Sequence, residues 1–97
     1  MSRKYVCPCC GCLTVDKLKA WSICPVCFWE DEGGVYDGDT VRDDVYSVPN
    51  HMTLAQARDN YRRFGACRKE LSSKTREPTE QEIVGSYMRI AEKIKDN

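Results

Sequence analysis

The chain has 97 residues, 31% of them charged, and equal numbers of basic and acidic side chains give a formal net charge of zero. This balance lacks the strongly basic footprint of a general nucleic-acid binder, and no apolar run approaches the roughly 18 residues that would cross a membrane. A single domain of this length buries only roughly 60–65% of its unfolded surface. A covalent or metal staple would therefore contribute much of its stability.

Cysteine is the most informative residue type in the chain. There are seven cysteines, and six of them lie within the first 27 residues. No signal-peptide pattern precedes them, so we expect a chain that stays in the reducing cytoplasm. In that compartment paired cysteines indicate metal binding before disulfides.

Two segments, Cys7–Cys10 and Cys24–Cys27, share the pattern Cys-Pro-x-Cys. In such a knuckle proline presets φ for a tight turn, and Gly11 can take the positive φ that closes the first one. Thirteen residues separate the two segments, enough for a short hairpin to bring them face to face. Four sulfurs at about 2.3 Å from one ion form a closed tetrahedral zinc site. The predicted ligands are Cys7, Cys10, Cys24 and Cys27.

A four-cysteine site leaves no coordination position for water, so we expect the metal to be structural and not catalytic. Apparent binding free energies for such zinc sites run to roughly 10–16 kcal/mol, more than a small core supplies alone. Iron in the same cage is the alternative metal. Cys9 lies in the turn, where its sulfur would project away from the metal, and the sequence assigns no role to Cys9, Cys12 or Cys67.

The remaining residues predict a small α+β fold. Residues 1–50 would form a zinc-ribbon-like unit with short β-hairpins and an acidic loop, and residues 51–97 two helices that pack on it as one compact domain. The stretch Glu30–Tyr46 carries seven acidic side chains and one basic one. Such a stretch is either a solvated loop or a surface for a basic partner.

Both helix starts carry a capping-box pattern, Thr53–Gln56 and Thr79–Glu82. Gly65 is placed to end the first helix, and Cys67–Glu77 between the helices is predicted as a loop. Each helix has an apolar stripe. The first is formed by Leu54, Ala57, Tyr61 and Phe64, and the second by Ile83, Tyr87, Ile90 or Ala91, and Ile94.

The aromatic residues Trp21, Phe28 and Trp29 flank the second knuckle. Packing over the metal site is the simpler interpretation, and an exposed platform on which bases stack is the alternative. A dithiol redox role is a further alternative, because Cys7 and Cys10 have thioredoxin-like spacing. Such enzymes place the first cysteine at a helix start, whereas here the strand-like Leu13–Val15 follows.

These motifs identify a resemblance to a known family. The segments that carry it are Tyr5–Gly11, Ile23–Asp31, Leu54–Tyr61 continuing to Phe64–Gly65, and Arg76–Thr79. Through them the chain resembles the CPCC family of small bacterial cysteine-rich proteins. The resemblance implies a zinc-ribbon-like unit followed by helices. Cys9 belongs to the family pattern, whereas Cys12 departs from it.

For function, we expect a non-enzymatic protein-interaction module, since no paired-carboxylate, Ser-His-Asp or phosphate-loop motif is present. One form of this role is an immunity or antitoxin protein, whose acidic side chains would suit a basic nuclease toxin. The alternative is a nucleic-acid-binding zinc ribbon, with phosphate contacts from Arg3, Lys4, Lys17, Lys19 and the segment Arg58–Arg76. A dithiol redox protein is third.

Overall fold

The computed structural model of the chain describes residues 4–83, and its regular elements are short. Within these residues, eight strands pair two by two into antiparallel hairpins. The pairs are β1 (Tyr5–Val6) with β2 (Leu13–Val15), β3 (Ala20–Ile23) with β4 (Glu30–Glu32), β5 (Tyr36–Asp37) with β6 (Thr40–Val41), and β7 (Tyr46–Ser47) with β8 (Met52–Thr53). The helical elements are the 3₁₀ turn η1 (Gly33–Val35), the α-helix α1 (Leu54–Phe64) and the 3₁₀ segments η2 (Lys69–Lys74) and η3 (Glu80–Glu82).

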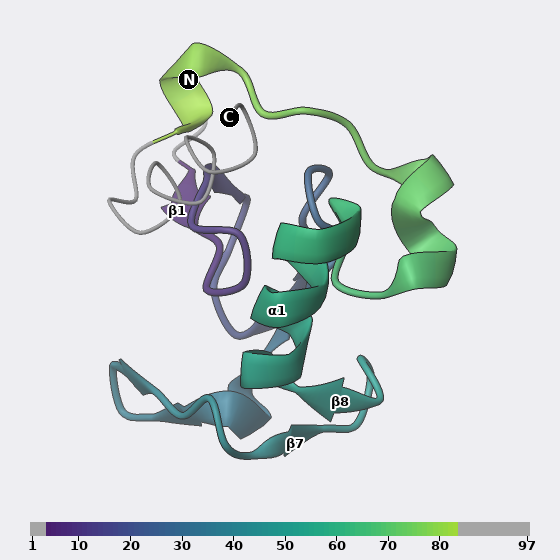
Figure 1. The fold of residues 1–97 in the computed structure, drawn as a ribbon. Helices are drawn as coiled ribbons and strands as arrows, with labels where there is room; N and C mark the ends of the chain where they lie inside the picture. Colours follow the sequence, from purple (N-terminus) through teal and green to yellow (C-terminus); the bar gives the residue numbers. More distant parts are fainter. Residues whose placement is uncertain (1–3, 84–97) are drawn as a thin grey trace.

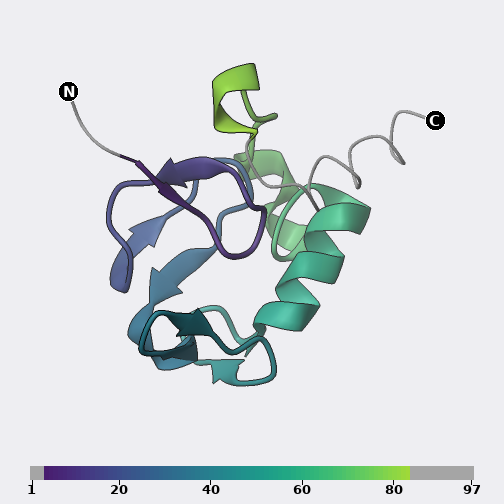
Figure 2. The ribbon, with the colours of Figure 1, turned by 90° about the vertical axis from the view of Figure 1, so that its left-hand side faces the viewer.

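The hairpins and α1 enclose the interior from different sides (Figure 1). Figure 2 shows the β1–β2 and β3–β4 hairpins on one side, α1 on the other, and the later hairpins at the bottom near the start of α1. This agrees with the predicted small α+β class with short hairpins, and α1 is the one α-helix within residues 4–83.

The start and end of α1 confirm the predicted signals. The Gln56 backbone N–H donates to Thr53 Oγ1 at 3.2 Å, and the Thr53 N–H donates to Gln56 Oε1 at 2.9 Å, which completes the capping box. Gly65 has a left-handed φ of 75°, and its N–H donates to the Tyr61 carbonyl at 2.8 Å. The buried face of α1 consists of Leu54, Ala57 and Tyr61.

The predicted second helix beginning at Thr79 is not confirmed, because a short 3₁₀ turn stands at its predicted start. The Thr79 N–H does donate to Glu82 Oε1 at 2.8 Å, but the 3₁₀ turn ends after three residues. Ile83 is extended, with φ −85° and ψ 95°, and forms an isolated bridge with Cys12. Pairing with the knuckle thus replaces helix continuation at this residue. The rest of the predicted stripe, Tyr87 to Ile94, lies outside the described residues.

Two segments predicted as loops contain regular structure. The residues Cys67–Glu77 include η2, and the acidic stretch folds into strands β4 to β6 with η1 between them. Its seven acidic side chains differ in exposure. Asp31 and Glu32 are buried, Glu30 is half-buried, and the exposed ones are Asp37, Asp39, Asp43 and Asp44.

The buried carboxylate of Glu32 joins two hairpins. It accepts hydrogen bonds from the Gly34 N–H at 2.6 Å and from Ser47 Oγ at 3.0 Å. Asn50 extends this network, because its side chain donates to Ser47 Oγ at 2.8 Å and exchanges two hydrogen bonds of 2.9 Å with the Glu30 backbone. Buried polar groups require such partners, so this part of the acidic stretch supports the fold.

Sulfur makes up much of the core. The seven cysteines, all within the described residues, are each at most 1% exposed. The largest fully buried apolar side chains packed with them are Trp29, Leu54, Val15, Val26 and Val35. A core with so few large aliphatic side chains buries little apolar area, which makes a metal ion at its centre a major potential source of stability.

Candidate metal centre

The first knuckle lies at the tip of the β1–β2 hairpin. Two backbone hydrogen bonds close it: the Gly11 N–H donates to the Cys7 carbonyl, and the Cys7 N–H donates to the Cys12 carbonyl, both at 2.8 Å. Gly11 has a φ of 76°, the left-handed value expected from the sequence.

The second knuckle, at the tip of the β3–β4 hairpin, repeats these two hydrogen bonds. The Phe28 N–H donates to the Cys24 carbonyl at 2.8 Å, and the Cys24 N–H donates to the Trp29 carbonyl at 2.9 Å. Phe28 takes the place of Gly11 and has a φ of 69°, a conformation that costs a residue with a Cβ about 1–2 kcal/mol. The expectation that one hairpin joins the knuckles is wrong, because each knuckle belongs to its own hairpin.

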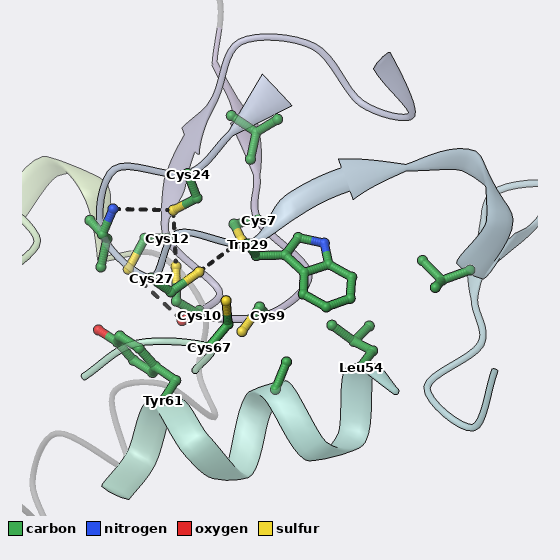
Figure 3. Close-up of a cluster of buried hydrophobic side chains, with 14 of the residues drawn as sticks. Cys7, Cys9, Cys10, Cys12, Cys24, Cys27, Trp29, Leu54, Tyr61 and Cys67 are labelled. Atoms are coloured by element: carbon green, nitrogen blue, oxygen red, sulfur yellow. Dashed lines mark hydrogen bonds between the residues drawn. The ribbon is translucent and has the colours of Figure 1, made fainter. Parts of the chain in front are cut away.

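The four predicted sulfurs lie together in the interior. Their Sγ atoms are all within 4.8 Å of one another, and all four side chains are fully buried (Figure 3). Cys7 Sγ is 3.6 Å from Cys27 Sγ, and Cys10 Sγ is 3.6 Å from Cys24 Sγ. Sulfurs about 2.3 Å from one tetrahedral ion are about 3.8 Å apart. The cluster therefore has dimensions compatible with a bound metal ion.

Hydrogen-bond donors gather around one of these sulfurs. Cys24 Sγ lies 2.9 Å from Thr14 Oγ1 and accepts from the Val26 N–H at 3.4 Å. Hydrogen bonds from Cys10 above all, then from Cys27 and Cys7, lower the pKa of the Cys24 thiol. Sequence reasoning missed Thr14, although a hydroxyl two residues beyond a cysteine-rich turn is a usable signal.

Burial has the opposite effect on two of the other thiols. It is the main cause of the raised pKa of both Cys7 and Cys27. The pKa of Cys10 is also raised, because it shares hydrogen bonds with Cys12 and Cys24. The opposite shifts arise because these thiols are buried together and share hydrogen bonds. A divalent ion would bind the thiolate forms and release their protons.

The chemistry of the donor set favours a soft metal. Thiolates select zinc or iron over hard cations such as magnesium. Four thiolates complete a tetrahedral shell and leave no position for water or substrate. The arrangement is suited to holding two hairpins together.

Three cysteines lie outside the four-sulfur cluster, and each is buried. Cys12 occupies the place in its knuckle that Trp29 has in the other, and its thiol lies 3.8 Å from the Cys10 carbonyl. Cys9 is equivalent to the buried Val26. Cys67 follows α1, and its N–H donates to the Cys27 carbonyl at 2.7 Å, which ties this segment to the second knuckle.

The aromatic residues near the second knuckle have different environments. Trp29 is fully buried and its Nε1–H donates to Asp31 Oδ1 at 3.3 Å, as the packing interpretation expected. Phe28 is half-buried. Trp21 is 60% exposed and has a φ of 67°, so it is the one of the three that remains available for stacking.

Some cations that the sequence offered for phosphate contacts are engaged within the protein. Arg58 donates to the Pro8 carbonyl at 2.8 Å and lies 3.7 Å from Asp43. The Lys19 ammonium donates to the Gly38 carbonyl at 2.8 Å. These contacts give the two side chains structural roles. Arg3 lies outside the described residues.

Comparison with known families gives the affiliation of the chain. The family described as "Cysteine-rich CPCC" matches residues 5–82. The chain belongs to this family. The matched residues include both knuckles, α1 and η3, as expected from the sequence resemblance.

The other comparisons find nothing similar: no curated protein and no solved structure matches the chain. Among the helices of residues 4–83, none has the length and apolar character that a membrane span requires.

Proposed function

We propose that this is a non-enzymatic metal-binding protein in which Cys7, Cys10, Cys24 and Cys27 hold one structural zinc ion. The observation that carries the proposal is the mutual proximity of four buried sulfurs within 4.8 Å. Zinc is favoured over iron because it requires no redox partner and is the usual ion of closed four-cysteine sites. Thiolate ligands require reduced cysteines, which supports a cytoplasmic location.

The metal content of purified full-length protein tests this proposal. Elemental analysis should give one zinc ion per chain. Serine substitution of Cys24 should abolish binding, whereas Cys67→Ser, which alters an equally buried thiol outside the cluster, should retain it. Iron in place of zinc would overturn the identity of the metal, and retention of zinc by Cys24→Ser would overturn the ligand set.

The metal-bound unit would act as a protein-interaction module. Support comes from residues 43–48, which expose two carboxylates, Asp43 and Asp44, and two large apolar side chains, Tyr46 at 56% and Val48 at 71%. Interfaces combine exposed aromatic and apolar groups with charges complementary to the partner. This segment suits a basic protein, and an immunity protein that covers a basic nuclease toxin is one concrete form of the role.

Affinity capture with tagged protein from its source cells, after nuclease treatment, would identify such a partner. Binding of the purified partner should weaken at least about tenfold when Asp43 and Asp44 are both changed to Asn. Glu70→Gln, an exposed acidic change outside the segment, is the matched control. Rescue of cells from the partner's toxicity would establish the immunity form. Equal binding by all variants would rule out this surface.

A nucleic-acid role is the second candidate, supported by a different surface. Arg62, Arg63 and Arg76 line a cavity of about 390 Å³ beyond the end of α1. However, Arg62 and Arg63 both lie near Asp59, and Arg76 forms a bidentate pair with Glu82. Retention of RNA or DNA at low salt that falls steeply as salt rises would favour this candidate. No retention near 50 mM salt would reject it.

A further inference from the structure

Two cysteines outside the metal cluster, Cys9 and Cys67, lie near α1. Cys9 is fully buried and Cys67 is 1% exposed. In Figure 3 their side chains come from opposite directions and point toward each other above the helix. The residues are far apart in the sequence, so the fold itself creates this pair.

The backbone on both sides of the pair is fixed by the same helix. From α1, Arg58 Nε donates to the Pro8 carbonyl at 2.8 Å, next to Cys9. Asn60 Nδ2 donates to the Cys67 carbonyl at 2.9 Å, and the Cys67 N–H donates to the Cys27 carbonyl at 2.7 Å. These hydrogen bonds hold the backbone at Cys67 and next to Cys9 in place.

The electrostatics couple Cys9 to Cys67 and also, through a hydrogen bond, to the predicted ligand Cys27, whose pKa is raised mainly by burial and further by this bond. Burial is the main cause that raises the pKa of the Cys67 thiol to about 12, and the neighbouring Cys9 is the second. Burial and a raised pKa make a thiol slow to react. Oxidation of the pair therefore requires local opening of the bend after α1, which contains Cys67 and has no regular structure.

We propose that Cys9 and Cys67 form a disulfide on exposure to a peroxide, so that the protein carries an oxidation site made of two thiols that are not among the four predicted metal ligands. One thiol first loses its S–H bond and becomes a sulfenic acid, as hydrogen peroxide is reduced to water. The other thiol then displaces the hydroxyl group, an S–S bond forms, and a second water leaves. In total, two thiols lose two hydrogens, and one peroxide becomes two waters.

The product would join the first knuckle covalently to the segment that follows α1. Val26, the equivalent of Cys9 in the second knuckle, fills its buried position without a reactive group. A small apolar side chain is therefore sufficient for packing at this place. The disulfide would leave all four clustered sulfurs available to the metal, and it would hold α1 against the knuckle if the metal were lost.

The test is oxidation of the full-length, zinc-loaded protein with limiting hydrogen peroxide. Intact mass, peptide mapping without reduction and a chromophoric chelator would follow the oxidised residues and any released zinc. We expect loss of two hydrogens, a mapped Cys9–Cys67 linkage and retention of zinc. Cys67→Ser should abolish the linkage, whereas Cys12→Ser, a change at another buried thiol outside the cluster, should preserve it.

Two results would overturn the proposal: a first disulfide that includes a clustered cysteine and appears together with zinc release, or oxidation that never links Cys9 to Cys67. Peptide mapping of the unmodified protein decides the question even if a serine variant does not fold. Zinc content is measured in the same samples. Absence of bound zinc would therefore contradict the metal assignment, whereas absence of a Cys9–Cys67 linkage in zinc-loaded protein would contradict the disulfide alone.

Discussion

The Thr14 hydroxyl oxygen lies 2.9 Å from Cys24 Sγ, so a side chain from the first hairpin contacts a sulfur of the second knuckle. Thr14 belongs to β2 and is 4% exposed. A hydroxyl buried against a thiolate can donate its hydrogen and disperse the negative charge. Such contacts around ligands orient them and adjust metal affinity.

We predict that Thr14→Val lowers metal affinity about tenfold, in line with the loss of one hydrogen bond to a ligand. Valine keeps the branched shape but cannot donate. Thr14→Ser should stay near the original affinity, since it retains the hydroxyl. Competition with a chromophoric chelator measures both. Equal affinities for the valine and serine variants would show that the hydroxyl does not stabilise the ligand.

Metal affinity should fall as pH falls. Burial raises the pKa of Cys7 and Cys27, so these groups are protonated without metal, and the metal-bound state holds fewer protons than the metal-free or unfolded state. Stability supplied by the metal therefore rises with pH and is lost on acidification. Affinity should change at least about tenfold per pH unit between about pH 6 and pH 8. A flat profile would indicate fewer thiolate ligands.

Asp31 should be required for folding stability although it belongs to an acidic stretch. Its carboxylate is fully buried and accepts from the Lys19 N–H at 2.9 Å, from Trp29 Nε1 at 3.3 Å and from the Tyr36 hydroxyl at 3.0 Å. Asp31→Asn turns an acceptor into a donor that faces other donors, at a cost of about 2 kcal/mol. Urea unfolding measures the loss. The exposed Asp37→Asn serves as control and should have little effect.

Gly65→Ala should destabilise the protein by about 1 kcal/mol. Space is not the reason, because an added Cβ would meet nothing within 4 Å; the cause is the φ of 75°. Gly33→Ala is the matched control, since its added Cβ would only touch Lys19 Cβ at 3.9 Å without a positive φ. Thermal unfolding should show a lower midpoint for Gly65→Ala alone. Equal midpoints would mean that the left-handed cap carries no strain.

Local signals in the sequence were sufficient for several elements. The repeated Cys-Pro-x-Cys pattern predicted which four sulfurs come together. Each knuckle is formed by residues adjacent in the chain, and the repetition of the pattern indicated that the two knuckles share one site. The limits of α1 followed from Thr53 and Gly65. Caps and tight turns are determined within about four residues.

Features that depend on distant partners were not predictable. The sequence alone favours a solvated Asp31, because no local pattern shows that Tyr36 and Trp29 will donate hydrogen bonds to its carboxylate. The capping-box pattern at Thr79 predicts a helix, but Ile83 instead forms a bridge with Cys12. No local sequence pattern predicts this contact. Tertiary pairing overrides local propensity at such places.

The central claim is that one metal ion is held by four thiolates, and cobalt substitution tests it most directly. Cobalt(II) reports its coordination in its visible spectrum, because a tetrahedral four-thiolate site gives intense d–d bands and strong sulfur-to-metal charge transfer. We predict that spectrum at one cobalt per chain, displaced by one equivalent of zinc and reduced in charge-transfer intensity by Cys7→Ser. A weak octahedral spectrum, or an unchanged one in Cys7→Ser, would contradict the account.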